Sequence, residues 1–209
     1  MILPRDIPGL PPVPPGQQAT LQAVARLAQT CEFEVNHTLQ VTTLALSLFD
    51  GLAALHRLGE CERTFLIYAG LLHDIGWIEG WKDHHKVTLR IILTTPMLPF
   101  SNKERLLIGS VARYHRKSLP DAKHDHYATL SDKEQQVVCV LAGCLRLADG
   151  LDHSHQQHVR AVKVKVTAKK ISLTCDCQPP LPEEEQAARE KSDLLEKTLK
   201  RKLVFIGLV

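Results

Sequence analysis

The chain has 209 residues, of which 44% are hydrophobic, and its 26 Lys and Arg nearly balance its 23 Asp and Glu. This length and composition suit a folded domain with a sizeable core and exclude a chain that is disordered throughout. A formal net charge of +3 is too small to indicate nucleic-acid binding, and an aromatic content of 5% argues against a surface that stacks bases.

Nothing in the sequence indicates membrane insertion or secretion. No apolar run approaches the roughly 20 residues that a membrane-spanning helix needs. The first residues lack the basic stretch followed by an apolar stretch that marks a signal peptide. The six cysteines form no CxxC pair, so we expect reduced thiols and a cytoplasmic protein.

The first part of the chain predicts an arm followed by helices. Residues 1–16 contain six of the twelve prolines and are expected to form an extended arm. From residue 17 to about 116, apolar residues recur at helical spacing, and the stretch 64–73 is apolar on all sides, which is typical of a buried central helix. Capping-box spacing predicts two further helix starts, at Ser101 with Glu104 and at Ser131 with Glu134.

The hydrophobic period changes after residue 158. Val162, Val164 and Val166 alternate with polar residues, which predicts a half-buried strand whose valines face inward. A second strand, a helix over about 183–202 and a third strand complete the pattern. We therefore expect a mainly α fold, with a helical bundle over 17–158 and a small β-β-α-β lobe over 159–209. The lobe is expected to be structural, or a surface for a partner, rather than catalytic.

Histidine is unusually frequent, with eleven residues, and several lie where helices are predicted to start or end. A buried, ionised aspartate is costly unless it is paired or bound to a metal, and helical bundles build metal sites from several helices. Taken singly, each residue could be a surface or satisfied core histidine, or part of a helix-ending turn. Taken together, their order favours a metal site. The predicted ligands are His37, His73, Asp74, His115, Asp149 and one of the adjacent pair His84 and His85.

The order of these residues resembles the HD superfamily of metal-dependent phosphohydrolases. More narrowly, residues 20–206 resemble the C-terminal HD domain of the exopolyphosphatase/guanosine pentaphosphate phosphatase (Ppx/GppA) family. The resemblance implies an HD-type helical bundle. It is carried by the stretches HTLQVTTLALSLFDGL, LIYAGLLHDIGW, HHKVTLRIIL, SVARYHRKSLP and LRLADGLDHSHQQHV.

This resemblance leaves two points open. The sequence does not contain the N-terminal actin-like domains that carry the family's phosphatase site, so that activity cannot be transferred to it. Of the adjacent His84 and His85, the register of the HD proteins favours His85, and His84 remains the alternative.

Imidazole and carboxylate ligands suit one or two divalent ions, namely Mn, Fe, Zn, Co, Ni or Mg.

The resemblance implies a metal-dependent phosphohydrolase acting on a nucleotide or another small phosphorylated compound, with polyphosphate or a guanosine alarmone included. Metal-activated water would attack phosphorus, and nearby cations would stabilise the phosphoryl oxygens. The alternative is a non-catalytic regulatory module that binds polyphosphate, an alarmone or a protein partner, and a homodimer is left open. The predicted catalytic residues are His73, Asp74, Arg116, Lys117 and Arg146.

Overall fold

A computed structural model describes residues 9–178 and 180–208. The first half of the predicted arm, residues 1–8, lies outside the described residues. Residues 9–17 contain turns but no helix or strand, as expected for a proline-rich segment, and Val13 is buried against the core. The helical part of the chain then comprises α1 (Gln18–Thr30), α2 (Val35–Gly51), α3 (Ala53–His56), α4 (Glu60–Leu72), the 3-10 helix η2 (Ile75–Glu79), α5 (His84–Thr94), α6 (Asn102–Arg113), α7 (Asp125–Ala128) and α8 (Asp132–Leu151).

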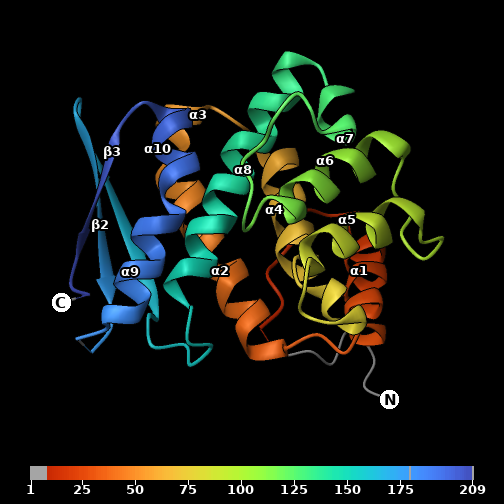
Figure 1. Ribbon diagram of the computed structural model, residues 1–209, viewed down its shortest axis with the longest axis horizontal. Helices are drawn as coiled ribbons and strands as arrows, with labels where there is room; N and C mark the ends of the chain where they lie inside the picture. Colours follow the sequence, from red (N-terminus) through yellow and green to blue (C-terminus); the bar gives the residue numbers. More distant parts are fainter. Residues whose placement is uncertain (1–8, 179, 209) are drawn as a thin grey trace.

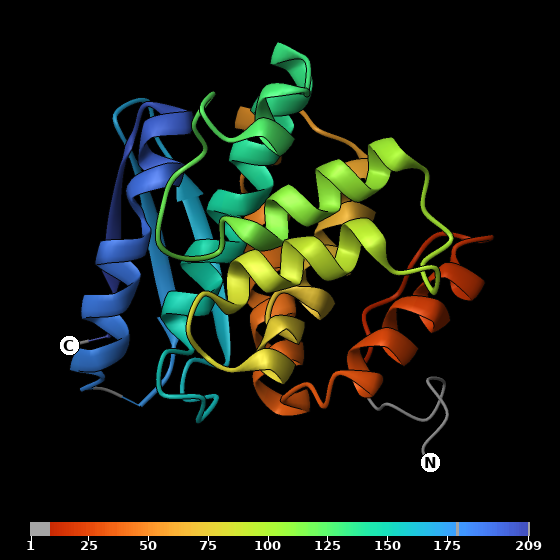
Figure 2. The same ribbon diagram turned by 45° about the vertical axis from the view of Figure 1, so that its right-hand side comes forward.

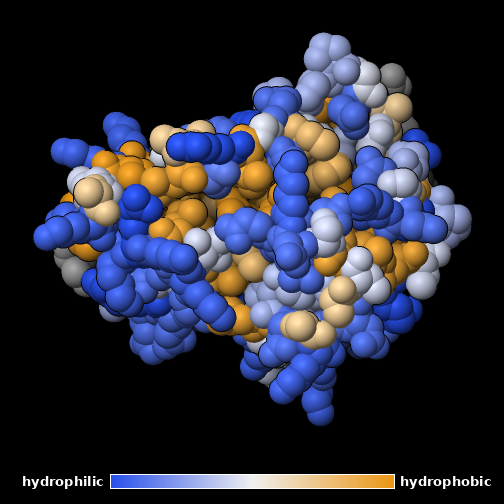
Figure 3. Space-filling model, turned by 90° about the horizontal axis from the view of Figure 1, so that it is seen from above, coloured by the Kyte–Doolittle hydropathy of each residue, from blue (hydrophilic) through white to orange (hydrophobic). Residues whose placement is uncertain are grey.

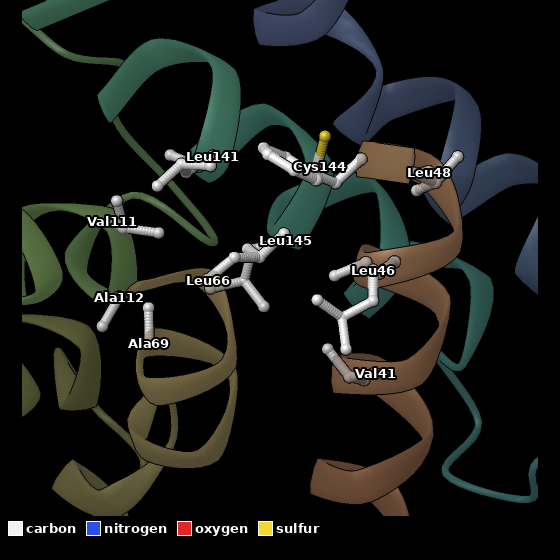
Figure 4. Close-up of a cluster of buried hydrophobic side chains, with 14 of the residues drawn as sticks. Val41, Leu46, Leu48, Leu66, Ala69, Val111, Ala112, Leu141, Cys144 and Leu145 are labelled. Carbon is white, nitrogen blue, oxygen red and sulfur yellow. The ribbon is translucent and has the colours of Figure 1, made fainter. Parts of the chain in front are cut away.

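Helix α8 lies near the centre of the molecule, between other long helices and the C-terminal lobe (Figures 1 and 2). It contacts α2, α4 and α6 on one side and the C-terminal lobe on the other. Residues 137–151 of this helix, VVCVLAGCLRLADGL, are almost wholly buried, because the stretch is mostly apolar. Figure 4 shows the core between these helices, where Leu141 and Leu145 of α8 lie near Leu66 of α4 and Val111 of α6.

Both predicted capping boxes are present. The Ser101 backbone N–H donates to the Glu104 carboxylate over 2.8 Å, and the Ser131 N–H donates to the Glu134 carboxylate over 2.9 Å. These bonds satisfy N–H groups that the first turn of a helix leaves without partners, so α6 and α8 begin where the sequence predicts. The segment between α6 and α8 contains the short helix α7, which buries Tyr127.

The C-terminal lobe holds the small sheet. Strands β1 (Ala161–Val166), β2 (Lys170–Asp176) and β3 (Lys202–Ile206) lie in that order, with β1 antiparallel and β3 parallel to β2. Along β1 the valines are more buried than the lysines, as the alternation predicts. Val164 packs on Gly51 of α2, where a Cβ atom would lie 2.6 Å from the valine. The fold is therefore mainly helical with a small sheet near the C-terminus, which confirms the predicted class.

The predicted helix over 183–202 is two helices, α9 (Pro182–Lys191) and α10 (Asp193–Leu199), which meet at Ser192. Both pack against α8. The approach is close, since a Cβ on Gly150 would lie 2.9 Å from the Ala188 Cα atom. Seen from above, apolar side chains are visible between polar ones on the half of the molecule that holds this lobe (Figure 3). Within the described residues, no helix is long and apolar enough to cross a membrane.

Candidate metal centre

Five helix ends bring the histidine and aspartate candidates together. His37 lies in the first turn of α2, and Asp149 lies in the last turn of α8. His73 ends α4, and Asp74 follows it at the start of η2. All are buried or nearly so. The remaining members are His84 at the first position of α5 and His115, two residues beyond the last residue of α6.

Gly76 lets α5 approach the His73–Asp74 turn. A Cβ atom at this position would lie 2.1 Å from the backbone oxygen of His84, so no side chain fits there. Thr88 joins the same two segments, because its hydroxyl donates to the His73 carbonyl and accepts from the Gly76 N–H, both over 3.0 Å. The sequence HDIG thus places His84 beside Asp74.

The two oxygens of Asp74 face different histidine pairs. Its Oδ1 lies 3.1 Å from the His84 Nε2 and 3.4 Å from the His115 Nε2. Its Oδ2 lies 3.5 Å from the His73 Nε2 and 3.9 Å from the His37 Nε2. The carboxylate therefore joins two clusters, one made with His37 and His73 and the other with His84 and His115.

Hydrogen bonds fix which nitrogen of each histidine faces the clusters. The Nδ1 atoms of His73, His84 and His115 bond to the backbone oxygens of Gly70, Trp81 and Ala112 over 2.7 to 2.9 Å. A carbonyl oxygen can only accept, so Nδ1 carries the proton and Nε2 keeps its lone pair when the ring is neutral. This is the arrangement that orients metal-ligating histidines.

Two carboxylates surround His37. Its Nδ1 bonds to Asp152 Oδ2 over 2.8 Å, and its Nε2 lies 3.5 Å from Asp149 Oδ1. Burial lowers the pKa of His37, but the bonds to Asp149 and Asp152 outweigh burial and raise this pKa to about 10. Burial raises the pKa of Asp149, but the charge of Lys191 and the hydrogen bond to His37 outweigh burial and hold this pKa well below 3.8. The same negative field that favours a proton on His37 Nε2 favours a metal cation there.

The residues present fit a divalent metal. The Nε2 atoms of His37 and His73 and the Oδ1 of Asp74 are buried without a hydrogen-bond partner among the described residues. The Nε2 atoms of His84 and His115, both with lone pairs, face each other at 3.3 Å. Such facing acceptors repel unless a cation lies between them. Ligands about 2.1 Å from one ion lie roughly 3.0–3.4 Å apart, close to most of the separations seen here.

His85 does not join either cluster, although the sequence favoured it over His84. Adjacent helical residues point about 100° apart, so only one of the two can face Asp74. The His85 ring is perpendicular to that of His84, with 5.8 Å between the centroids, and its Nδ1 is buried without a partner in the described part of the chain. Burial lowers the pKa of His85 to about 4.

A cavity of about 420 Å³ opens beside the clusters. Asp74, His115 and Asp149 of the clusters line it, and so do the predicted cations Arg116 and Lys117. Arg146 lines it too, but its Nε and Nη2 are bonded to Asp193 of α10 over 2.8 and 3.2 Å. This ion pair uses one edge of the guanidinium, and the Arg146 Nη1 atom is buried without a partner among the described residues. The remaining lining residues are Trp77, Trp81, His153, His155, Glu190 and Lys191.

The lobe contributes Lys191, which the sequence analysis missed. Its Nζ lies 2.5 Å from Asp149 Oδ2, so the lobe supplies a charged side chain that contacts a predicted metal ligand. Nothing in the polar sequence of α9 marks this lysine, and only the packing of α9 on α8 reveals it. Asp152 was also missed, although an aspartate three residues after Asp149, near a predicted helix end, was a usable signal. His155 stacks on the His37 ring, with centroids 3.6 Å apart, and covers it from the loop after α8.

The fold and the site together define a class of protein: a mainly helical domain with a histidine and aspartate site built at five helix ends. A small β lobe adds a lysine to this site. A family model described as Ppx/GppA phosphatase, domain III, matches residues 20–201. The chain therefore belongs to the Ppx/GppA phosphatase family as a relative of its domain III, as its sequence motifs had indicated.

Proposed function

We propose that the chain is a metal-dependent phosphohydrolase that acts on a nucleotide or another small phosphorylated compound. One observation carries this proposal: each oxygen of the Asp74 carboxylate faces its own pair of histidine Nε2 atoms. Membership of a phosphatase family that acts on polyphosphate or guanosine polyphosphates supports a phosphorylated substrate. The proposed ligands of one or two divalent ions are His37, His73, Asp74, His84, His115 and Asp149.

Each residue has a defined task in this proposal. When bound, the ions would lower the pKa of water and polarise phosphoryl oxygens. Asp74 holds both positions together, and the backbone carbonyls behind the histidines keep Nε2 aimed inward. Arg116 and Lys117 lie on the cavity wall, where they can neutralise charge that develops on a phosphoryl group. Lys191 orients Asp149 and provides a further positive charge at the rim.

The test compares metal content and hydrolysis in the parent protein and in Asp74→Ala. Protein purified without chelator is expected to contain Mn, Fe, Zn, Co, Ni or Mg at one or two ions per chain by mass spectrometry. It should hydrolyse at least one member of a panel of nucleotides, phosphodiesters and polyphosphates. Asp74→Ala should lose the metal and at least 100-fold of the activity, because it removes the shared ligand.

The control is Asp176→Ala, which removes an exposed aspartate of the β lobe that pairs with Arg160. This variant should keep both metal and activity, and circular dichroism should show the same helix content for all three proteins. Metal-loaded parent protein that hydrolyses nothing in the panel contradicts the enzymatic proposal and favours a binding module.

A further inference from the structure

Both tryptophans of the chain line the cavity beside the candidate metal centre. Trp77 is 46% exposed and Trp81 is 63% exposed, which is unusual for the largest apolar side chain. Exposed aromatic surface that gathers at one functional cavity indicates a site that binds a ligand, whereas a single scattered apolar residue needs no explanation.

The backbone ties each tryptophan to a proposed metal ligand. The Trp77 N–H donates to the Asp74 carbonyl over 3.0 Å, and the Trp81 carbonyl accepts from His84 Nδ1 over 2.9 Å. The Trp77 indole also stacks on the His84 ring, with centroids 5.1 Å apart and an angle of 26° between the planes. These bonds hold the backbone of both tryptophans beside Asp74 and His84, and the stacking on His84 holds the Trp77 indole at the edge of the clusters.

Positive side chains line the same cavity. Arg116 and Lys117 come from the segment after α6, and Lys191 comes from α9. A ligand that uses the whole cavity must therefore offer anionic groups and a flat apolar ring. The volume of about 420 Å³ lies in the range of small-molecule sites.

We infer that the substrate is a nucleotide whose base stacks on Trp81 and Trp77 while its phosphate reaches the His/Asp clusters. This inference rests on the proposed function and narrows its substrate class, because inorganic polyphosphate has no ring to stack. Stacking on an exposed indole suits every base, so Trp81 recognises the nucleotide class and does not choose the base. The low aromatic content had argued against base stacking, but both tryptophans of the chain line this cavity.

The first experiment uses the tryptophans as reporters. Since both indoles line the cavity, their fluorescence should respond to a base that stacks there. In buffer with Mg²⁺, GMP and AMP should quench the fluorescence of the full chain in a saturable way. Ribose 5-phosphate and inorganic tripolyphosphate, which lack a base, should bind at least tenfold more weakly in calorimetry.

The second experiment uses variants. Trp81→Ala should weaken GMP binding about tenfold in calorimetry, and Trp81→Phe should recover most of that loss because it keeps an aromatic face. Ile78→Ala is the matched control, since Ile78 is 51% exposed in the same segment but does not line the cavity. It should bind GMP as the parent does. Sedimentation should show the same oligomeric state for all variants.

The outcomes separate this inference from the proposed function. Hydrolysis of tripolyphosphate with no preference for nucleotides, unchanged in Trp81→Ala, supports the phosphohydrolase and overturns the nucleotide inference. Saturable GMP binding that Trp81→Ala weakens, without hydrolysis of any substrate, supports the nucleotide site and contradicts the enzyme. A change of oligomeric state in Trp81→Ala with unchanged GMP affinity overturns the inference, since the indoles would then cover a protein interface.

Discussion

Two adjacent histidines at the start of α5 differ in their relation to the clusters: His84 belongs to one of them and His85 does not. His84 and His85 are both buried, but only His84 reaches Asp74. The register of the HD proteins favoured His85, but α5 begins with both histidines and the rotational phase of a short helix is set by its packing. Here Gly76 and Thr88 set that phase by holding the first turn of α5 against the His73–Asp74 turn.

This neighbouring pair gives a matched test of the site. His84→Gln should reduce the bound metal to one ion per chain or less, because it removes one ligand of the second cluster. His85→Gln should keep the metal content of the parent. Metal analysis after gel filtration measures both, and the melting temperature checks that each variant is folded. Equal loss of metal in the two variants would contradict the assignment of His84.

At the scale of elements, the sequence predicts regular structure well and contacts between elements poorly. Helical periodicity, two capping boxes and the valine alternation gave α6, α8 and β1 with nearly their observed bounds. The break between α9 and α10 was missed because Lys191-Ser192-Asp193 contains no glycine or proline. Lys191 was missed for another reason: its role arises from the packing of α9 on α8, two segments distant in sequence.

The capping box of α8 gives a prediction about pH. A bond from Lys103 and further bonds from Ser131 lower the pKa of Glu134 from 4.5 to about 2. A carboxyl with a lowered pKa stabilises the fold above its unfolded pKa, and this contribution is lost as the pH falls from about 4.5 toward 2. Glu134→Gln should therefore be less stable than the parent at pH 7, and the difference should shrink as the pH falls.

Urea unfolding at a series of pH values from 7 to 3 measures this difference. The matched control is Glu32→Gln, which neutralises an exposed glutamate outside any capping box. A difference between Glu134→Gln and the parent that stays constant across the series would show that the charge of Glu134 does not contribute.

At the scale of the molecule, an ion pair of the candidate metal centre joins the β lobe to the helical bundle. Lys191 of α9 neutralises Asp149 of α8, and the Asp149 Oδ1 lies 3.5 Å from the His37 Nε2. Close packing at Gly150 brings the two helices near enough for this contact. The lobe therefore contributes to the electrostatic balance of the clusters as well as to the fold.

Lys191→Met tests this coupling. The variant should lose about 2 kcal/mol of unfolding free energy without metal, because a buried carboxylate loses a charged hydrogen bond. Excess Mn²⁺ should restore part of the loss, since the ion can take over the neutralisation of Asp149. Thermal unfolding with and without Mn²⁺ measures both effects. Lys197→Met, an exposed lysine on α10, is the control and should match the parent.

The clusters also draw on segments that are far apart in the chain, from His37 near the start of α2 to Asp149 near the end of α8. An unfolded chain cannot assemble such a set, so an ion held there would act as a cross-link that exists only in the native state. By mass action, an ion at 100 times its dissociation constant would add about 2.7 kcal/mol to the unfolding free energy. The melting temperature should therefore fall in EDTA and rise with the logarithm of metal concentration. A midpoint that is the same in EDTA and in excess Mn²⁺ would show that no such cross-link forms.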